Sequence, residues 1–247
     1  MNNTYQDSKT AQNYLNFLTS TNGQLQQNFL WESIKKYLPE QKNTKILDAA
    51  CGSGWLTSKL KNLQYEIEAF DISESLISEA KNTVPNVNFK VWNLNQSLPY
   101  FKNYFDCVIL NMAGPDLENL EIAFLHLNQI LKTEGVLILT LPNPKYTYPT
   151  AVWKRSLLDF LLFRKPKLKI VSSAEKELKN ISREFKKGQT ILSNFYPTDT
   201  YLKTAENLGL KLQTLEEINS LKDSPNFDLQ YQLFRYPLLL TLVFKKS

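Results

Sequence analysis

The sequence predicts an α/β protein built on a mostly parallel sheet. Short apolar or alternating runs are interleaved with helical patterns over roughly the first 140 residues, the alternation that builds parallel sheets. One apolar run, Lys45–Ala49, leads directly into two glycines spaced by one residue, and a helical pattern begins at Trp55. A strand, a tight turn and a helix N-terminus in this order form the ligand-binding corner of an open parallel sheet.

The residues around this turn point to a nucleotide-like ligand. Gly52 and Gly54 remove side chains where the backbone must approach a ligand closely. Asp48 stands at the carboxyl end of the first strand, the edge at which open α/β sheets bind ligands. A second strand pattern ends at Asp71, 17 residues after Gly54, where a carboxylate can accept from a ribose diol.

These motifs resemble those of the class I S-adenosylmethionine-dependent methyltransferases. The family's first motif, acidic-x-Gly-x-Gly-x-Gly, is matched by Asp48, Ala50, Gly52 and Gly54, with Ala50 where the family often has glycine. The resemblance is good from Tyr5 to Leu141 and looser beyond. It implies a Rossmann-like seven-stranded sheet in the order 3-2-1-4-5-7-6, with the last strand antiparallel and helices on its sides. The implied cofactor is S-adenosylmethionine, leaving S-adenosylhomocysteine, without a metal.

The resemblance also implies a set of cofactor contacts at the ends of the strands. In that set, Asn93 would accept from the adenine amino group through its carbonyl oxygen; the alternative is a solvated turn residue. Tyr14 would form a wall of the pocket; the alternative is that residues 1–40 are a helical extension packed on the sheet. The complete set is Tyr14, Asp48, Ala50, Cys51, Gly52, Gly54, Asp71, Ile72, Asn93, Leu94 and Asn111.

Further elements are expected along the rest of a single domain, residues 1–247. Leu117–Leu131 has the clearest helical pattern, and Thr198–Leu208 is a second helix stopped by a glycine. The remaining strands are expected at 87–91, 105–110, 135–141, 210–216 and 237–244.

Residues 150–190 are expected to form a helical lid inserted after the fifth strand. An aromatic and apolar half is followed by a basic half, and Ser172 with Glu175 forms a capping-box signature before a predicted basic helix ending at Lys187. Between Lys154 and Lys187 there are 11 Lys/Arg and 4 Asp/Glu, a net charge of +7 in a chain of +5. The basic character therefore belongs to this insertion, whether as a binding surface or as a solvated face.

Composition and cysteine content predict the compartment in which the protein works. The 247 residues contain no run of 18 apolar residues and start without a signal-peptide pattern. Two cysteines make no disulfide framework, so we expect a reduced, cytoplasmic protein. No cluster has metal-ligand spacing.

The catalytic residues are less clearly indicated. His126, the only histidine, lies roughly opposite the apolar face of its helix and is expected to be exposed, so the usual general base is missing. Asn111, Asp116, Tyr146 and Tyr148 are the candidates for orienting an acceptor. The acceptor is expected to be a small hydrophobic or anionic molecule, with possible peripheral contact with a membrane or an anionic carrier. A non-catalytic S-adenosylmethionine-binding protein and a nucleic-acid methyltransferase are the alternatives, and the oligomeric state stays open.

Overall fold

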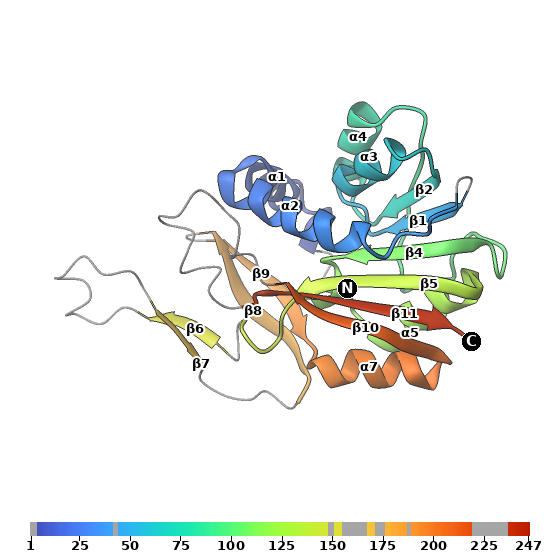
Figure 1. The fold of residues 1–247 in the computed structure, drawn as a ribbon. Coiled ribbons are helices and arrows are strands. Elements are labelled where there is room, and N and C mark those ends of the chain that lie inside the picture. The colour runs from blue at the N-terminus through green and yellow to red at the C-terminus, as the bar shows by residue number, and fades with distance from the viewer. Residues whose placement is uncertain are drawn as a thin grey trace.

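The computed structural model describes residues 4–41, 44–147, 151–154, 167–170, 176–186, 189–218 and 237–247. Its centre is a seven-stranded sheet with strands in the order β10-β11-β5-β4-β1-β2-β3 (Figure 1). The strands are β1 (Lys45–Ala49), β2 (Glu66–Asp71), β3 (Asn88–Val91), β4 (Phe105–Asn111), β5 (Leu131–Pro142), β10 (Leu210–Ile218) and β11 (Leu239–Lys246).

The topology of this sheet agrees with the predicted one. The first five strands pair in parallel, β2 and β4 on either side of β1, whereas β11 runs antiparallel to both β5 and β10. Numbered within the sheet alone, the order is 3-2-1-4-5-7-6 with the seventh strand antiparallel. Parallel pairing brings the carboxyl ends of β1, β2, β3 and β4 to one edge, so the loops predicted to bind the cofactor share that edge.

Helices cover both faces of the sheet (Figure 1). The helices α2 and α3 pack on one face, and α5 and α7 on the other. The helical elements are η1 (Thr4–Gln6), α1 (Ser8–Thr19), α2 (Thr21–Lys35), α3 (Trp55–Lys61), α4 (Glu74–Thr83), η2 (Gly114–Asp116), α5 (Leu120–Ile130) and α7 (Thr198–Asn207). Among the described residues, no helix combines the length and the apolar character needed to cross a bilayer.

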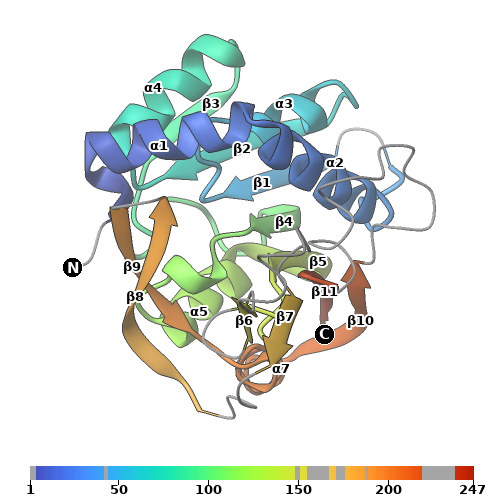
Figure 2. The same ribbon diagram turned by 90° about the vertical axis from the view of Figure 1, so that its left-hand side faces the viewer.

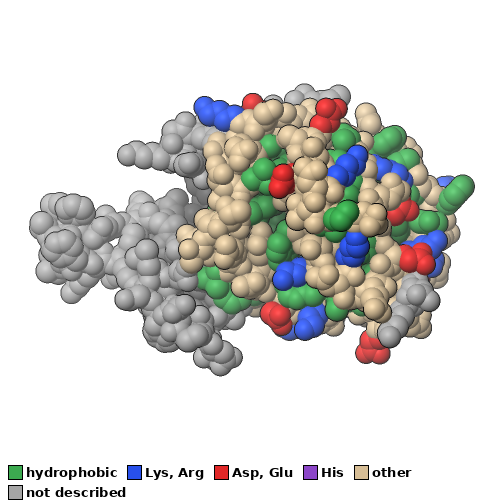
Figure 3. All heavy atoms as spheres, turned by 90° about the horizontal axis from the view of Figure 1, so that it is seen from above, with side chains coloured by type: hydrophobic (Ala, Val, Ile, Leu, Met, Phe, Trp, Pro, Cys, Tyr) green, Lys and Arg blue, Asp and Glu red, His purple; other side chains and the backbone are tan. Residues whose placement is uncertain are grey.

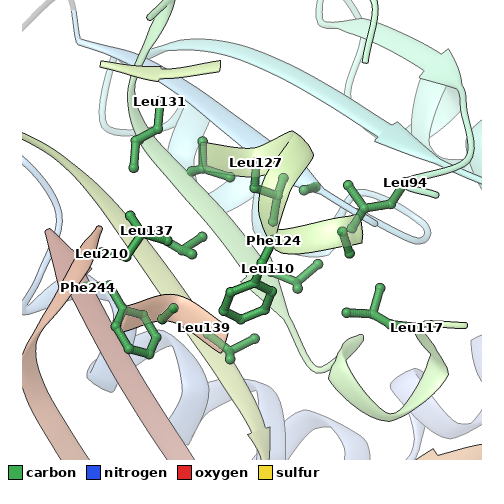
Figure 4. Close-up of a cluster of buried hydrophobic side chains, with 14 of the residues drawn as sticks. Leu94, Leu110, Leu117, Phe124, Leu127, Leu131, Leu137, Leu139, Leu210 and Phe244 are labelled. Carbon is green, nitrogen blue, oxygen red and sulfur yellow. The ribbon is translucent and has the colours of Figure 1, made fainter. Parts of the chain in front are cut away.

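The core consists of two apolar layers separated by the sheet. Successive side chains of a strand point to opposite faces, and β4 shows this: Leu110 packs with Phe124 of α5, whereas Ile109 packs with Leu60 of α3. Figure 4 shows the α5 side, where Phe124 and Leu139 meet side chains from several strands. Burial on both faces explains why the sequence of β4 is almost continuously apolar.

The N-terminal helices are attached to the far end of the sheet by a polar cluster. Glu216 of β10 accepts from Ser33 Oγ at 2.7 Å, from Tyr37 Oη at 3.0 Å and from Lys36 Nζ at 2.6 Å. Ser33 Oγ also lies 2.8 Å from Thr241 Oγ1 of β11. This cluster fixes the C-terminal end of α2 to the sheet.

The helical lid predicted for residues 150–190 is wrong for the parts that the structure describes. They form strands: β6 (Ala151–Lys154) pairs with β7 (Lys167–Ile170), and β8 (Leu178–Lys186) pairs with β9 (Gln189–Phe195), both antiparallel. The predicted basic helix therefore falls on β8, while Ser172 and Glu175 lie outside the described residues. Pairing with β9 outweighs the local helical pattern, because a strand is stabilised by packing against its neighbouring strand.

Candidate functional site

The loop after β1 has the conformation that glycines favour. Gly52 and Gly54 have φ of 55° and 79°, and Ala50, between strand and loop, has φ of 56°. A residue with a Cβ is strained in this region, which explains why glycine is common at the position of Ala50 in the resembling family. Gly54 is the N-cap of α3, so the helix N-terminus and its free amides face this loop.

Asp71 at the end of β2 holds the loop in place. Its Oδ2 accepts from the Gly52 amide at 2.8 Å and its Oδ1 from the Ser73 amide at 2.9 Å. The Cys51 amide adds a bond of 2.9 Å to Phe70 O, so two strand ends are joined. Burial raises the pKa of Asp71, and these amide bonds lower it in part. Asp71 is therefore a structural part of the loop as well as the predicted ribose contact.

Asp48 is a fully buried carboxyl group at the end of β1. Its Oδ2 accepts from Thr57 Oγ1 at 2.6 Å, while its Oδ1 has no hydrogen-bond partner among the described residues. Burial, together with the nearby charge of Asp71, raises the pKa of Asp48 to about 7, although the hydrogen bond from Thr57 lowers it in part. A buried acceptor of this kind is costly unless a donor from a ligand or water reaches it.

Tyr14 of α1 covers the glycine loop. Its ring carbon Cε1 lies 3.3 Å from the position that a Cβ on Gly52 would occupy. Burial raises the pKa of Tyr14, and the charges of Asp71, Asp116 and Asp48 raise it further. The three carboxyl groups that act on Tyr14 come from the ends of β1 and β2 and from the short helix η2 (Gly114–Asp116) that follows β4. In Figure 2, α1 crosses in front of the carboxyl ends of β1 and β2, which agrees with this contact.

The other predicted contacts on this side lie on the next strand ends. Ile72 follows Asp71, and its carbonyl oxygen accepts from Gln6 Nε2 at 3.5 Å. Asn93, after β3, accepts through Oδ1 from the Asn95 amide at 2.9 Å. Its oxygen thus supports the local turn, and its predicted bond to adenine stays a prediction. Leu94 is buried in the apolar core.

His126 is not the exposed residue that the sequence pattern indicated. It is half-buried on α5, and its Nδ1 lies 2.9 Å from the carbonyl oxygen of Leu94. The periodicity of α5 placed His126 away from the sheet, but it could not show that the loop after β3 passes over that side of the helix.

The loop after β4 forms the second half of the site. Asn111 Oδ1 accepts from Thr140 Oγ1 at 2.6 Å, and the Met112 amide donates to Thr140 O at 2.8 Å. The short helix η2 follows and carries Asp116, whose charge acts on Tyr14 and also on Tyr201 of α7. The charge of Asp116 thus acts both at the glycine loop, through Tyr14, and beside α7, through Tyr201.

A small pocket lies beside η2, between the end of β5 and the β8–β9 hairpin. Tyr146 belongs to the chain segment after β5, where its amide donates to Asn143 O at 3.0 Å, and Tyr148 lies outside the described residues. The pocket is lined by Pro115, Leu141, Pro142, Pro144, Thr147, Ile181, Ser193, Asn194, Phe195, Tyr196 and Tyr201.

Two residues of the site escaped the sequence analysis, Thr57 and Thr140. Both are fully buried polar residues that hydrogen-bond to predicted site residues, Asp48 and Asn111. A threonine inside the apolar run of β5 was the one sequence signal available for Thr140. In the part of the chain that the structure describes, no three His, Cys, Asp or Glu side chains group as metal ligands would.

The comparison with protein families agrees with this geometry. A family model described as a methyltransferase domain matches residues 23–215. The chain therefore belongs to the class I S-adenosylmethionine-dependent methyltransferase family.

The alignments with individual relatives cover only part of each relative's length. A malonyl-[acyl-carrier protein] O-methyltransferase of Buchnera aphidicola is 29% identical over 130 residues, 53% of this chain and 50% of that protein. A ubiquinone/menaquinone biosynthesis C-methyltransferase of Yersinia enterocolitica is 31% identical over 114 residues, 42% of this chain and 45% of that protein. The chain thus spans about half the length of the curated relatives it matches.

Among solved structures, an S-adenosylmethionine-dependent methyltransferase from Mesorhizobium loti superposes with a TM-score of 0.72 at 19% identity. The match covers 90% of this chain and 100% of that one. At this identity, the likeness concerns the fold alone.

Proposed function

We propose that the protein transfers a methyl group from S-adenosylmethionine to a small acceptor with an apolar body. The observation that carries the proposal is the acidic cradle at the glycine loop. There, the buried Oδ1 of Asp48 has no hydrogen-bond partner among the described residues, the charge of Asp71 acts on Asp48, and Tyr14 covers Gly52. A cradle of carboxyl groups suits a cation.

The cofactor matches these residues chemically. S-adenosylmethionine carries a positive sulfonium and a positive amino group, which suit the carboxyl groups of Asp48 and Asp116. Its ribose hydroxyls are donors for Asp71, at the strand end where open sheets bind a ribose. When bound, the cofactor supplies a methyl group that is already activated by the positive sulfur.

The protein's own task is then mainly to align the acceptor and exclude water. Tyr14 and α1 cover the loop, which keeps solvent from this part of the site. Good alignment of two reactants can contribute about 7–11 kcal/mol to lowering a barrier. Asp116 is our candidate for orienting the acceptor, because it lies in η2 next to Pro115, which lines the pocket.

The pocket beside η2 favours an apolar acceptor. Its walls include three prolines and two tyrosines. Its polar groups already bond to the protein: Asn194 Nδ2 donates to Leu117 O at 2.6 Å, and Tyr196 Oη donates to the same oxygen at 3.1 Å. Relatives named for acyl-carrier and quinone chemistry are in keeping with such an acceptor, and their names include both O- and C-methylation.

An anionic group on the acceptor, or on a carrier or membrane that presents it, would find its partner in the basic insertion. On the face seen in Figure 3, the described residues carry interspersed positive and negative side chains. In the sequence, the net charge of +7 at 154–187 exceeds the +5 of the whole chain. If it binds the acceptor, salt raises the acceptor's KM and leaves cofactor affinity almost unchanged. Replacing Arg164, Lys165, Lys167 and Lys169 with Gln should reproduce that effect; an unchanged KM in both tests would assign the charges to a solvated face.

Methyl transfer itself is tested with S-adenosylmethionine labelled in its methyl group. The protein is incubated with a cell extract, which is then separated into organic-soluble, protein and nucleic-acid fractions. We expect label in the organic fraction or, for a carrier-bound acceptor, in the protein fraction. With the Asp71→Asn variant, which keeps the side-chain volume and removes the charge, all fractions should be labelled only weakly.

The alternatives give different results in the same experiment. Label in nucleic acid would replace the small-molecule acceptor with a polynucleotide. Tight cofactor binding in calorimetry, with no fraction labelled, would favour a non-catalytic S-adenosylmethionine-binding protein. Absence of cofactor binding would overturn the proposal altogether.

A further inference from the structure

The histidine of α5 makes a contact that neither the fold nor the acceptor chemistry requires. His126 Nδ1 lies 2.9 Å from the carbonyl oxygen of Leu94, a residue 32 positions earlier. A carbonyl oxygen can only accept, so Nδ1 must carry the proton and donate. The flanking residues Leu125 and Leu127 follow the helix pattern, exposed and buried respectively, so the core packing of α5 does not depend on a histidine between them.

The loop that His126 reaches is the one predicted to meet the adenine ring. Among the further hydrogen bonds that shape it, three are donated by backbone amides. The Trp92 amide donates to Asp71 O at 2.9 Å, and the Gln96 and Asn95 amides donate to the backbone and side-chain oxygens of Asn93, both at 2.9 Å. The first ties the loop to β2 and the others close its own turn. The bond from His126 is the one of these four that fixes the loop to a helix.

The position of Leu94 makes that bond consequential. Leu94 is 6% exposed, and its side chain belongs to the same apolar cluster as Phe124 and Leu127 of α5. Figure 4 shows the side chains of Leu94 and Phe124 in this cluster. The loop is thus held to α5 twice, by an apolar contact and by a directional hydrogen bond. The apolar contact sets the distance, and the hydrogen bond sets how the peptide between Leu94 and Asn95 is turned.

We propose that His126 is a positioning residue for cofactor binding: by donating to Leu94, it holds the loop after β3 in the orientation that receives the adenine ring. The inference rests on the proposed use of S-adenosylmethionine. Without the donor, the carbonyl oxygen of Leu94 is left without its partner near the core, so the peptide rotates to find another donor. Asn93 and the backbone amides beside it then turn away from the ring.

A pair of substitutions separates the hydrogen bond from the packing. In His126→Asn, the amide nitrogen occupies nearly the place of Nδ1 and still donates. His126→Leu fills similar space and donates nothing. Gln129→Leu is the control, because it adds the same side chain at an exposed position of α5. The dissociation constant for S-adenosylmethionine is measured by calorimetry, together with the melting temperature without cofactor and the acceptor KM.

We expect His126→Leu to raise the dissociation constant about tenfold, the factor that one lost hydrogen bond predicts. His126→Asn should stay within about threefold of the wild type, and the control should not differ from it. The acceptor KM should not change in any variant, because the loop after β3 is not part of the acceptor pocket.

Each other outcome overturns the proposal. An unchanged dissociation constant in His126→Leu would show that the loop keeps its orientation without the donor. Equal weakening in both variants, with equal loss of melting temperature, would make His126 a packing residue only. If the wild-type protein itself does not bind S-adenosylmethionine, the proposed function fails first and takes this inference with it; binding by the wild type with no difference among variants refutes the role of His126 alone.

Discussion

The two halves of the carboxyl edge are built in different ways. On the β1–β2 side, the bonds that shape the site join residues close in sequence: Thr57 to Asp48 over 9 positions and Gly52 to Asp71 over 19. On the β4–β5 side, Asn194 and Tyr196 reach Leu117 over 77 and 79 positions. The glycine-loop part of the proposed cofactor site is therefore held by bonds within residues 48–71, whereas the proposed acceptor site is assembled from distant segments.

This difference has a functional consequence. A short, self-contained motif can be kept while the rest of the chain varies, so members of one fold share a cofactor and differ in acceptor. The comparisons agree with this view, because the named relatives align over about half of their own length. Perturbing the first half should abolish cofactor binding, and perturbing the second should change only the acceptor.

The largest effect is expected from Asp71→Ala. The substitution removes two hydrogen bonds from amides to a buried carboxylate, and each charged bond contributes about 1.5–3 kcal/mol. We expect the dissociation constant for S-adenosylmethionine to rise by more than tenfold and, in addition, a lower free energy of unfolding in urea. The loss of stability is expected because Asp71 is buried and accepts from two backbone amides. Asp199→Ala, at an exposed position of α7, is the control.

A second prediction concerns the pH dependence that Asp48 brings to cofactor binding. Its pKa is raised from 3.8 to about 7, so the folded protein holds an extra proton between about pH 4 and pH 7 that the unfolded chain has lost. Without cofactor, this contribution makes the protein less stable as pH rises through that window. A cationic cofactor prefers the ionised carboxylate, so its affinity should rise by up to about tenfold as pH increases through 7. In Asp48→Asn, both trends should flatten; a pH profile identical to the wild type would exclude Asp48 as the group responsible.

The smallest effect is expected on the acceptor side, from Gly114→Ala. A Cβ at this position would lie 2.7 Å from the hydroxyl oxygen of Tyr201, which is buried at 1% exposure and has little room to move. Overpacking of this kind costs about 1–3 kcal/mol. The acceptor KM should rise while the dissociation constant for the cofactor stays the same. Adding Tyr201→Phe removes the clashing oxygen and should restore part of the loss; a double variant no better than Gly114→Ala would contradict the packing explanation.

Much of the architecture follows from the sequence alone. The strands of the main sheet were recognisable from their apolar or alternating runs, and the resemblance supplied their order, which the structure matches. The glycine loop and Asp48 could be located because a close ligand approach and a buried strand demand particular residue types at fixed spacing. Local sequence is sufficient to predict the loop, because the interacting residues lie close together along the chain.

Other features depended on tertiary contacts that local patterns do not record. Residues 178–186 carry a helical charge pattern but pair with β9, because a strand is stabilised by its neighbour more than by its own composition. His126 was predicted to face solvent, and the loop bearing Leu94 passes close enough to bond to it. The bond from the Gly52 amide to Asp71 is likewise visible only once β1 and β2 lie side by side. The sequence by itself determined where the cofactor loop lies and what it is made of; the tertiary structure decided which distant groups pair with it, because those pairings depend on how the chain is packed.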